Sequence, residues 1–405
     1  MWMLAMLAAV TGPLTFDLAP GAPPRPGSVA VAEGTPYQPG GHGYEPGGRA
    51  RERLFSVAVP EGNYRVTVRL GDAHASSRTT VKAESRRLML RAITTAPGQF
   101  VTASFVVNVR TAALTPPPAN APGGTAVRLK PREAGSYTWD DKLTLEFLGD
   151  PRVQRVTIEP VAVPTVFLAG DSTVTDQRAE PAASWGQMLP ALFQPDIAIA
   201  NHAESGETLK SFVTELRFDK LLSQVKPGDW VLIQFGHNDQ KAEWPQTYAD
   251  PVVTYPAWLR TYIAEVRRRG GRPVLVTSPE RRNFDAGRIR HTLADYAEAM
   301  RKVAGAEGVP LVDLQAASIA LYEAYGPAEA TKLFNDGGRD KTHHNNEGAW
   351  LLARAVAAGL AAAAPDLGLH LYPDARRFDP AHPPALDSLA LVPSLAASSE
   401  RPAGS

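Results

Sequence analysis

Small polar residues follow three apolar runs of the chain, at the points where each run ends. The three polar segments are Gly170-Asp171-Ser172 after VFLA, Asn201-His202-Ala203 after IAIA, and Gly236-His237-Asn238-Asp239 after VLIQF. A fourth polar segment, GGRDKTHHNNEGAW, lies near the C-terminus and contains Asp340 and His343. A serine hydroxyl, an imidazole and a carboxylate are together the groups that nucleophilic acyl transfer requires.

These residue types can fill every role in the hydrolysis of an ester by a serine. Ser172 comes directly after an apolar run, where a sharp turn would expose its hydroxyl. The spacing of three between Asp340 and His343 places a carboxylate and an imidazole on one side of a turn. Gly206 can present a backbone N–H without a side chain in the way, and Asn238 can present an amide, so both can stabilise an oxyanion.

Each residue also has an ordinary structural interpretation. A serine after a strand is commonly a helix N-cap, and Asn238 with Asp239 is typical of an Asx turn. The adjacent His343 and His344 leave open which imidazole would act as the base. The G-x-S-x-G elbow of α/β-hydrolases does not fit, because Val174 occupies its last position. The convergence of all the pieces at one edge of a sheet favours the catalytic interpretation.

Residues from Pro164 onward predict the scaffold that would bring the polar segments together. Buried-strand patterns alternate there with helical patterns, which predicts a parallel sheet covered on both faces. The stretch 208–225 is expected to form one helix, and 345–364 the last one. Ligands of such sheets bind beyond the carboxyl ends of the strands, where all the polar segments would lie.

The preceding residues predict a different architecture. Short alternating runs between Phe55 and Glu159 are typical of an all-β sandwich or jelly roll, and AVRLKP (126–131) is expected to be one of its strands. The Pro-rich stretch 115–124 reads as a long loop within that domain. The expected organisation is a possible signal-peptide remnant (1–14), a β-sandwich accessory domain (15–162), a catalytic domain (163–372) and a flexible C-terminal tail (373–405).

The composition excludes several classes of function. The chain has 405 residues with 42 basic and 42 acidic ones, so no net charge favours nucleic acid. It contains no cysteine, which excludes disulfides, thiolate nucleophiles and cysteine-bound metals. The opening MWMLAMLAAV is too short to span a membrane and lacks the basic residue expected before a signal peptide's apolar core. Two interpretations are open, a clipped or misannotated signal sequence and a disordered start of the chain; we favour the first and expect an extracytoplasmic location.

The polar segments resemble the four sequence blocks of the GDSL or SGNH hydrolases. The matching stretches are GDST (170–173), NHAESGET (201–208), GHND (236–239) and DKTH (340–343). The extended forms AGDSTVTDQ, PAASWGQMLP and GRDKTH resemble the rhamnogalacturonan acetylesterase-like branch, carbohydrate esterases that deacetylate pectic polysaccharides. The resemblance covers residues 165–364. It implies a three-layer α/β/α fold with a flavodoxin-like, parallel five-stranded sheet, and no cofactor or metal.

The resemblance also implies roles for particular residues. Ser172 would be the nucleophile, His343 the base and Asp340 its orienting carboxylate, with an oxyanion hole formed by the Ser172 and Gly206 N–H groups and the Asn238 amide. The family often has Gly-Arg-Ser where this chain has Gly206-Glu207-Thr208, so the sequence supports acetyl-ester chemistry better than pectin itself.

Tryptophan and histidine residues are further candidates for substrate or metal binding. Of Trp185, Trp244 and Trp258, only Trp185 lies near the first block, and it is the candidate for stacking on a sugar. His202 and His237 are interpreted as hydrogen-bonding core histidines. The β-rich half resembles galactose-binding-like modules, without a diagnostic motif. The expected partner is an acetylated polysaccharide or oligosaccharide. The alternatives are another SGNH activity (xylan deacetylase, lipase or thioesterase) and an inactive carbohydrate-binding protein.

Overall fold

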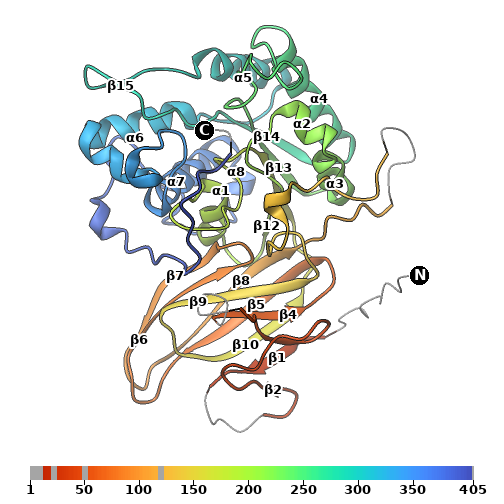
Figure 1. Ribbon diagram of the computed structural model, residues 1–405, viewed down its shortest axis with the longest axis vertical. Coiled ribbons are helices and arrows are strands. Elements are labelled where there is room, and N and C mark those ends of the chain that lie inside the picture. Colours follow the sequence, from red (N-terminus) through yellow and green to blue (C-terminus); the bar gives the residue numbers. More distant parts are fainter. Residues whose placement is uncertain (1–11, 20–24, 48–52, 117–122, 404–405) are drawn as a thin grey trace. The chain divides into compact units, whose positions relative to one another are not determined.

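The computed structural model describes residues 12–19, 25–47, 53–116 and 123–403 (Figure 1). Contacts divide the chain into two compact units. Unit 1 comprises residues 1–111, 135–163 and 391–396, and unit 2 comprises residues 112–134, 164–390 and 397–405. The chain therefore enters and leaves each unit more than once.

Unit 1 is built from two five-stranded sheets. One sheet has the order β2-β1-β10-β5-β8 and the other the order β3-β4-β9-β6-β7. The strands of the first sheet are β1 (Leu14–Asp17), β2 (Val29–Ala30), β5 (Gly62–Gly71), β8 (Phe100–Val109) and β10 (Val153–Pro160). Those of the second are β3 (His42–Tyr44), β4 (Leu54–Ala58), β6 (Ser77–Ala83), β7 (Arg87–Thr95) and β9 (Lys142–Asp150).

Alternating apolar residues explain why these strands pack face to face. Val66, Val68 and Leu70 of β5 are fully buried, whereas the residues between them are polar. They share one core with Leu143 and Leu145 of β9 in the other sheet. All strand pairs are antiparallel except β1 with β2. The predicted β-sandwich is confirmed, and it also contains β1, β2 and β3, which precede the short strands predicted between Phe55 and Glu159.

Unit 2 contains a five-stranded parallel sheet with the order β12-β11-β13-β14-β17. Its strands are β11 (Thr165–Gly170), β12 (Ala198–Asn201), β13 (Trp230–Gln234), β14 (Arg272–Val276) and β17 (Leu311–Val312). The second strand in sequence lies outside the first, and the others follow on the opposite side. This is the flavodoxin-like order with its switch point between the first and third strands. The predicted fold class is confirmed.

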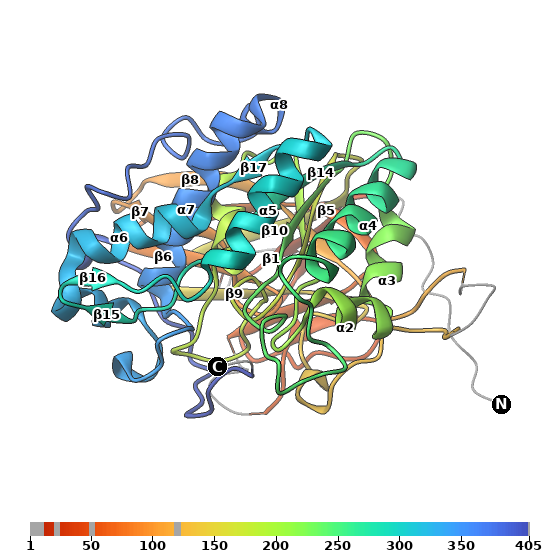
Figure 2. The same cartoon turned by 90° about the horizontal axis from the view of Figure 1, so that it is seen from above.

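Helices cover both faces of this sheet (Figure 2). One face packs against α2, α3, α4 and α5 through a cluster that includes Phe212, Phe218, Tyr262 and Met300. On the other face α7 packs against β17, α1 and α6. The α-helices are α1 (Trp185–Met188), α2 (Leu209–Thr214), α3 (Arg217–Gln224), α4 (Thr254–Arg268), α5 (Ala294–Glu307), α6 (Leu314–Glu329), α7 (Asn346–Ala363) and α8 (Pro365–Gly368). Short 3₁₀ turns and a small hairpin complete the unit: η1 (Pro131–Glu133), η2 (Leu189–Leu192), η3 (Ala330–Leu333), η4 (Asp336–Gly338), η5 (Leu386–Ser388), β15 (Phe284–Asp285) and β16 (Arg288–Ile289).

The single helix predicted over 208–225 is wrong, because the chain breaks between α2 and α3. Leu216 has a φ of 62°, in the left-handed region, and its side chain is buried. The break turns the first residue of α3, Arg217, into the protein interior, where it donates to Glu133. The break between α2 and α3 therefore coincides with a buried ion pair to the segment 112–134.

The segment 112–134 corrects the predicted domain assignment. Its described residues belong to unit 2, although they lie between strands of unit 1, so the described ends of the loop, residues 115–116 and 123–124, are not part of the sandwich. AVRLKP is not a strand: Ala126 forms one isolated bridge with Ala113, and Pro131 begins η1. Residues 117–122 lie outside the described residues.

The C-terminal tail was expected to be flexible, and its described part instead makes specific contacts. In unit 1, the Ser394 hydroxyl accepts from Lys82 and donates to Glu146, at 2.9 and 2.7 Å. In unit 2, Arg401 donates to Asp336 and the Ser398 N–H donates to the Glu180 carbonyl. Polar side chains thus anchor a segment whose composition alone indicated disorder.

Candidate functional site

The turn after β11 presents Ser172. The Asp171 carboxylate accepts from the Thr173 N–H and hydroxyl, both at 2.9 Å, and its carbonyl accepts from the N–H groups of Val174 and Thr175. A Cβ on Gly170 would lie 2.5 Å from a Val174 methyl, so the tight return of the chain requires glycine there. These bonds hold Ser172 at the carboxyl end of the sheet.

His343 connects Ser172 to Asp340. Its Nε2 lies 2.8 Å from the Ser172 Oγ, and its Nδ1 lies 2.9 Å from the Asp340 Oδ2. All three side chains are buried. A neutral ring that donates from Nδ1 to Asp340 can accept the serine proton at Nε2, which is the arrangement of a catalytic triad. The structure therefore brings these three predicted residues together.

The Asp340 carboxylate is held in its ionised form. Burial alone would raise its pKa, but the hydrogen bond and charge of His343 outweigh this and hold the pKa well below its usual range. Two backbone N–H groups, of Thr342 and His343, also donate to its Oδ1. The carboxylate can therefore orient the imidazole and stabilise its charged form.

His344, the alternative base, is placed in a different environment. Burial lowers its pKa to about 3, and the charge of His343 adds to this shift. Its Nε2 lies 2.7 Å from the Tyr322 hydroxyl, and its ring packs against Phe334. His344 is therefore a core residue, and of the two adjacent imidazoles only that of His343 contacts the Ser172 hydroxyl among the described residues.

Gly206 and Asn238 present N–H groups near the serine. Gly206 has a φ of 81°, a left-handed conformation that favours glycine, and neither its N–H nor that of Ser172 has an acceptor among the described residues. The Asn238 amide donates one hydrogen bond to the Glu207 carbonyl at 3.0 Å, which leaves its second N–H for another acceptor. The loops also touch directly, because the Glu204 N–H donates to the Gly170 carbonyl.

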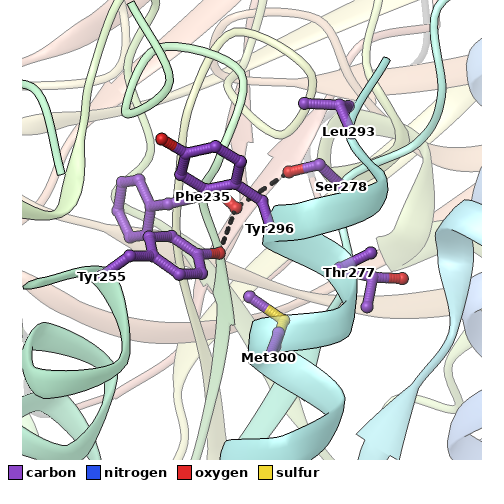
Figure 3. Close-up of a pocket in the computed structure, with 8 residues that line it drawn as sticks. Phe235, Tyr255, Thr277, Ser278, Leu293, Tyr296 and Met300 are labelled. Carbon is purple, nitrogen blue, oxygen red and sulfur yellow. Dashed lines mark hydrogen bonds between the residues drawn. The ribbon is translucent and has the colours of Figure 1, made fainter. Parts of the chain in front are cut away.

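The end of β13 is anchored so that Asn238 has a defined position. Figure 3 shows the Phe235 carbonyl accepting from the hydroxyls of Tyr255 and Ser278, at 2.8 and 2.9 Å. Gly236 follows with a φ of 144°, and a Cβ there would lie 3.2 Å from the Ser278 hydroxyl. The chain can thus turn sharply from the strand into His237 and Asn238.

Gln234 is a positioning residue that the sequence interpretation did not identify. Its amide donates to the Thr173 hydroxyl at 2.8 Å and accepts from the Trp185 Nε1 at 2.7 Å. It therefore ties the end of β13 to the turn that holds Ser172. The sequence does contain a signal for this role, because Gln234 is a polar residue at the last position of an otherwise apolar strand.

The predicted sugar-stacking role of Trp185 is wrong. Its side chain is 1% exposed, so no sugar ring can reach its face. Of the other two tryptophans, Trp244 is exposed and carries the Lys241 ammonium 4.2 Å from its ring centroid, whereas Trp258 packs against the helical core.

The remaining histidine candidates lie in the interior. His202 is buried beside Phe167, and the His237 Nδ1 lies 3.4 Å from the Asp171 Oδ2. Burial lowers the pKa of His237, against the charge of Asp171. Among the described residues, no cluster of three or more His, Cys, Asp or Glu is arranged to hold a metal ion. Nor does that part of the chain contain a helix long and apolar enough to cross a membrane.

A buried network of charges lies beside the Gly206 loop. Lys130 donates to the Glu207 carboxylate, and Arg217 lies 3.5 Å from it. Burial raises the pKa of Glu207 to about 7, against these two positive charges. Arg217 also donates to Glu133 of η1, so the segment 112–134 supplies two members of the network. No sequence pattern connected this segment with the site.

Asp239 is expected to make stability depend on pH. Burial raises its pKa to about 7 from 3.8, and its Oδ2 has no partner among the described residues. The folded state therefore binds this proton more tightly than the unfolded state, so the contribution is present at pH 4 and is lost as pH rises towards 7. Asp239→Asn should lose less thermal stability than the wild type between pH 5 and 8, as calorimetry can measure. Equal losses in the two proteins would contradict this assignment.

Comparison with known families identifies the central part of the chain. Residues 168–351 match the GDSL-like lipase/acylhydrolase family. This match begins in β11 and ends in α7, so it contains every residue of the Ser172–His343–Asp340 arrangement as well as Gly206 and Asn238.

Two curated proteins resemble about half of the chain, and one solved structure covers most of it. A rhamnogalacturonan acetylesterase of Bacillus subtilis (strain 168), RhgT, is 42% identical over 220 residues, which are 51% of this chain and 91% of that protein. A probable rhamnogalacturonan acetylesterase of the same organism, YesY, is 35% identical over 209 residues, 51% of this chain and 94% of that protein. The crystal structure of Bacillus subtilis YxiM covers 89% of this chain and 100% of its own, with 23% identity and a TM-score of 0.49.

Proposed function

The chain belongs to the GDSL-like lipase/acylhydrolase family and is an ester-hydrolysing enzyme, and from this premise we propose that it removes acetyl groups from a carbohydrate with Ser172 as the nucleophile. The observation that carries the proposal is the continuous line of hydrogen bonds from Asp340 through His343 to Ser172. Its supports are the ionised state of Asp340 and the two backbone N–H groups that face no acceptor among the described residues.

The reaction follows from this geometry. The Ser172 oxygen attacks the acetyl carbonyl while the His343 Nε2 takes the hydroxyl proton. The carbon–oxygen bond to the sugar then breaks, and His343 gives its proton to the leaving sugar oxygen, which leaves an acetyl ester on Ser172. Water attacks this ester with His343 again as the base, and acetate and free Ser172 result. Asp340 stabilises the imidazolium in both halves, and the proposed steps use only protein groups and water, without a metal or cofactor.

Asn238→Ala is expected to lower kcat by about 10²–10³-fold, because the amide would donate to the oxygen that becomes negatively charged in the transition state. The substrate carbonyl is a weaker acceptor before the attack, so KM should change much less. Steady-state kinetics on p-nitrophenyl acetate measures both constants. A variant that retains wild-type kcat would remove Asn238 from the proposed oxyanion hole.

The finer proposal is that the natural substrate is acetylated rhamnogalacturonan of pectin. Its support is the similarity to RhgT and YesY, which extends over more than nine-tenths of each of those proteins. We further propose an extracytoplasmic location, where a polysaccharide would be met. The opening residues 1–11, on which the signal-peptide expectation rests, lie outside the described residues. Fractionation of cells that express the full chain tests the location.

The decisive experiment measures acetate released from acetylated rhamnogalacturonan, acetylated xylan and p-nitrophenyl acetate, by the wild type and by Ser172→Ala. Release from rhamnogalacturonan that disappears in the variant would support both the chemistry and the substrate. Release from xylan alone would keep the mechanism and change the substrate. A wild type inert towards all three, and unlabelled by a serine-directed phosphonate, would overturn the acetylesterase proposal.

A further inference from the structure

Two arginines share one buried carboxylate at the edge of the Gly206 loop. The Arg132 Nε donates to the Glu204 Oε1 at 2.9 Å, and the Arg178 Nη2 donates to the Glu204 Oε2 at 3.1 Å. Arg132 also donates to the Ser205 carbonyl. The Glu204 side chain is 5% exposed, whereas those of Arg132 and Arg178 are 38% and 31% exposed. A buried anion thus holds two partly exposed guanidinium groups in fixed positions.

This cluster carries an excess positive charge at the surface. One carboxylate faces two guanidinium groups, and each guanidinium has five N–H donors, of which the described contacts use one or two. The neighbouring carboxylates of Glu133, Glu207 and Glu215 face Lys130 and Arg217 instead. They are engaged in the deeper network, so the exposed donors of Arg132 and Arg178 remain available to an anion from solution.

The pair lies next to the groups that would handle the ester. A Cβ on Gly206 would be 3.9 Å from the Arg132 Nη2. Arg178 follows Gln177, whose side chain donates to the Ser172 carbonyl at 2.8 Å. One arginine therefore flanks the oxyanion loop and the other extends from the nucleophile turn. The two arginines therefore belong to the surroundings of the two loops that supply the proposed nucleophile and an oxyanion donor.

We propose that Arg132 and Arg178 bind a carboxylate of an acidic polysaccharide, on a sugar unit close to the acetylated one, and so select an acidic substrate. Guanidinium groups match the planar geometry of a carboxylate and stay charged at all relevant pH values. This inference rests on the proposed acetylesterase function. Through Arg132, the segment 112–134 would take part in substrate recognition. The two arginines would also provide the positive charge that is absent from the sequence Gly206-Glu207-Thr208.

The test compares two matched substrates: acetylated oligogalacturonate, and the same oligomer with its carboxyl groups reduced to hydroxymethyl groups. The measured quantity is the ratio of kcat/KM for the acidic substrate to that for the neutral one. We expect the wild type to favour the acidic oligomer, and added salt to diminish this preference. Arg132→Gln and Arg178→Gln should each lower the ratio by about 10-fold, mainly through KM, as expected for a lost charge-assisted bond.

Arg128→Gln is the matched control, because Arg128 lies in the same segment, is exposed and makes no described side-chain contact. It should keep the wild-type ratio. A wild type that does not distinguish the oligomers, or arginine variants that retain the ratio, would overturn the inference while leaving the esterase intact. If Arg132→Gln does not fold, the inference is tested by the kcat/KM ratio of Arg178→Gln and by the wild type's preference for the acidic oligomer. A wild type inactive on both oligomers and on p-nitrophenyl acetate would instead overturn the proposed function.

Discussion

Ser172→Ala, His343→Ala and the double variant are all expected to lower kcat by about the same factor, on the order of 10⁴–10⁶. The physical reason is that the serine hydroxyl and the imidazole act as one unit. Without the base at 2.8 Å the hydroxyl keeps its proton, and without the hydroxyl the base has nothing to deprotonate. Removing the second group after the first should therefore have little further effect.

The chain offers a matched control for the histidine. Asp379 and His382 repeat the Asp-x-x-His spacing and the Nδ1–carboxylate hydrogen bond, at 2.7 Å, but this pair is exposed. His382→Ala should keep kcat within about twofold of the wild type, since surface substitutions of this kind have small effects. Single-turnover and steady-state assays on p-nitrophenyl acetate measure all four variants. If the fold-losses in kcat of the two single variants multiplied in the double variant, the cooperative arrangement would be contradicted. An active His343→Ala protein would contradict it as well.

Glu133→Gln is expected to destabilise unit 2 by about 3 kcal/mol, near the lower end of the range for breaking a buried ion pair. Arg217 is fully buried, and its two Nη groups donate to the Glu133 carboxylate. Burial raises the pKa of Glu133, but Arg217 outweighs this and lowers it, so the pair is ionised. The neutral amide would deprive the buried Arg217 charge of its bidentate partner and leave it facing Glu215 at 3.0 Å and Glu207 at 3.5 Å.

Thermal unfolding measures this loss, with an expected fall in Tm of about 6–12 °C for a unit of this size. Glu133→Gln combined with Arg217→Met should recover part of the stability, because the uncompensated charge is removed together with its partner. Glu329→Gln, in the exposed pair with Lys332, is the control and should change stability by less than 1 kcal/mol. A Glu133→Gln protein as stable as the wild type would refute the importance of the buried pair.

The sheet and the triad were predictable because both depend on local patterns. The apolar strands of unit 2 are continuous in sequence, and Ser172 and Asn238 follow strand ends directly. The choice of His343 rather than His344 came from the family resemblance, and the structure gives its physical reason in the burial of His344. The Asp-x-x-His spacing alone does not identify a catalytic pair, because Asp379 and His382 share this spacing and form an exposed pair outside the site.

The features that sequence missed depend on contacts between distant residues. Residues 126–131 alternate as a strand would, yet their described strand pairing is limited to the isolated bridge between Ala126 and Ala113. They lead instead to Glu133, whose partner Arg217 is 84 positions away. The helix breaks at Leu216, next to Arg217 of this ion pair, although the helical periodicity of the sequence continues across the break. The indole of Trp185 is buried, and proximity to Ser172 in sequence does not reveal which way such a side chain points.

The repeated passage of the chain between its two units bears on how the protein would respond to cutting. A nick between residues 163 and 164 separates the main parts of the two units in sequence. The N-terminal fragment would nevertheless keep residues 112–134 within unit 2, and the C-terminal fragment would keep residues 391–396 within unit 1. The two halves are interlaced, so a nicked chain should migrate as one particle under native conditions. Shuffling or grafting of the hydrolase half must carry the segment 112–134 with it.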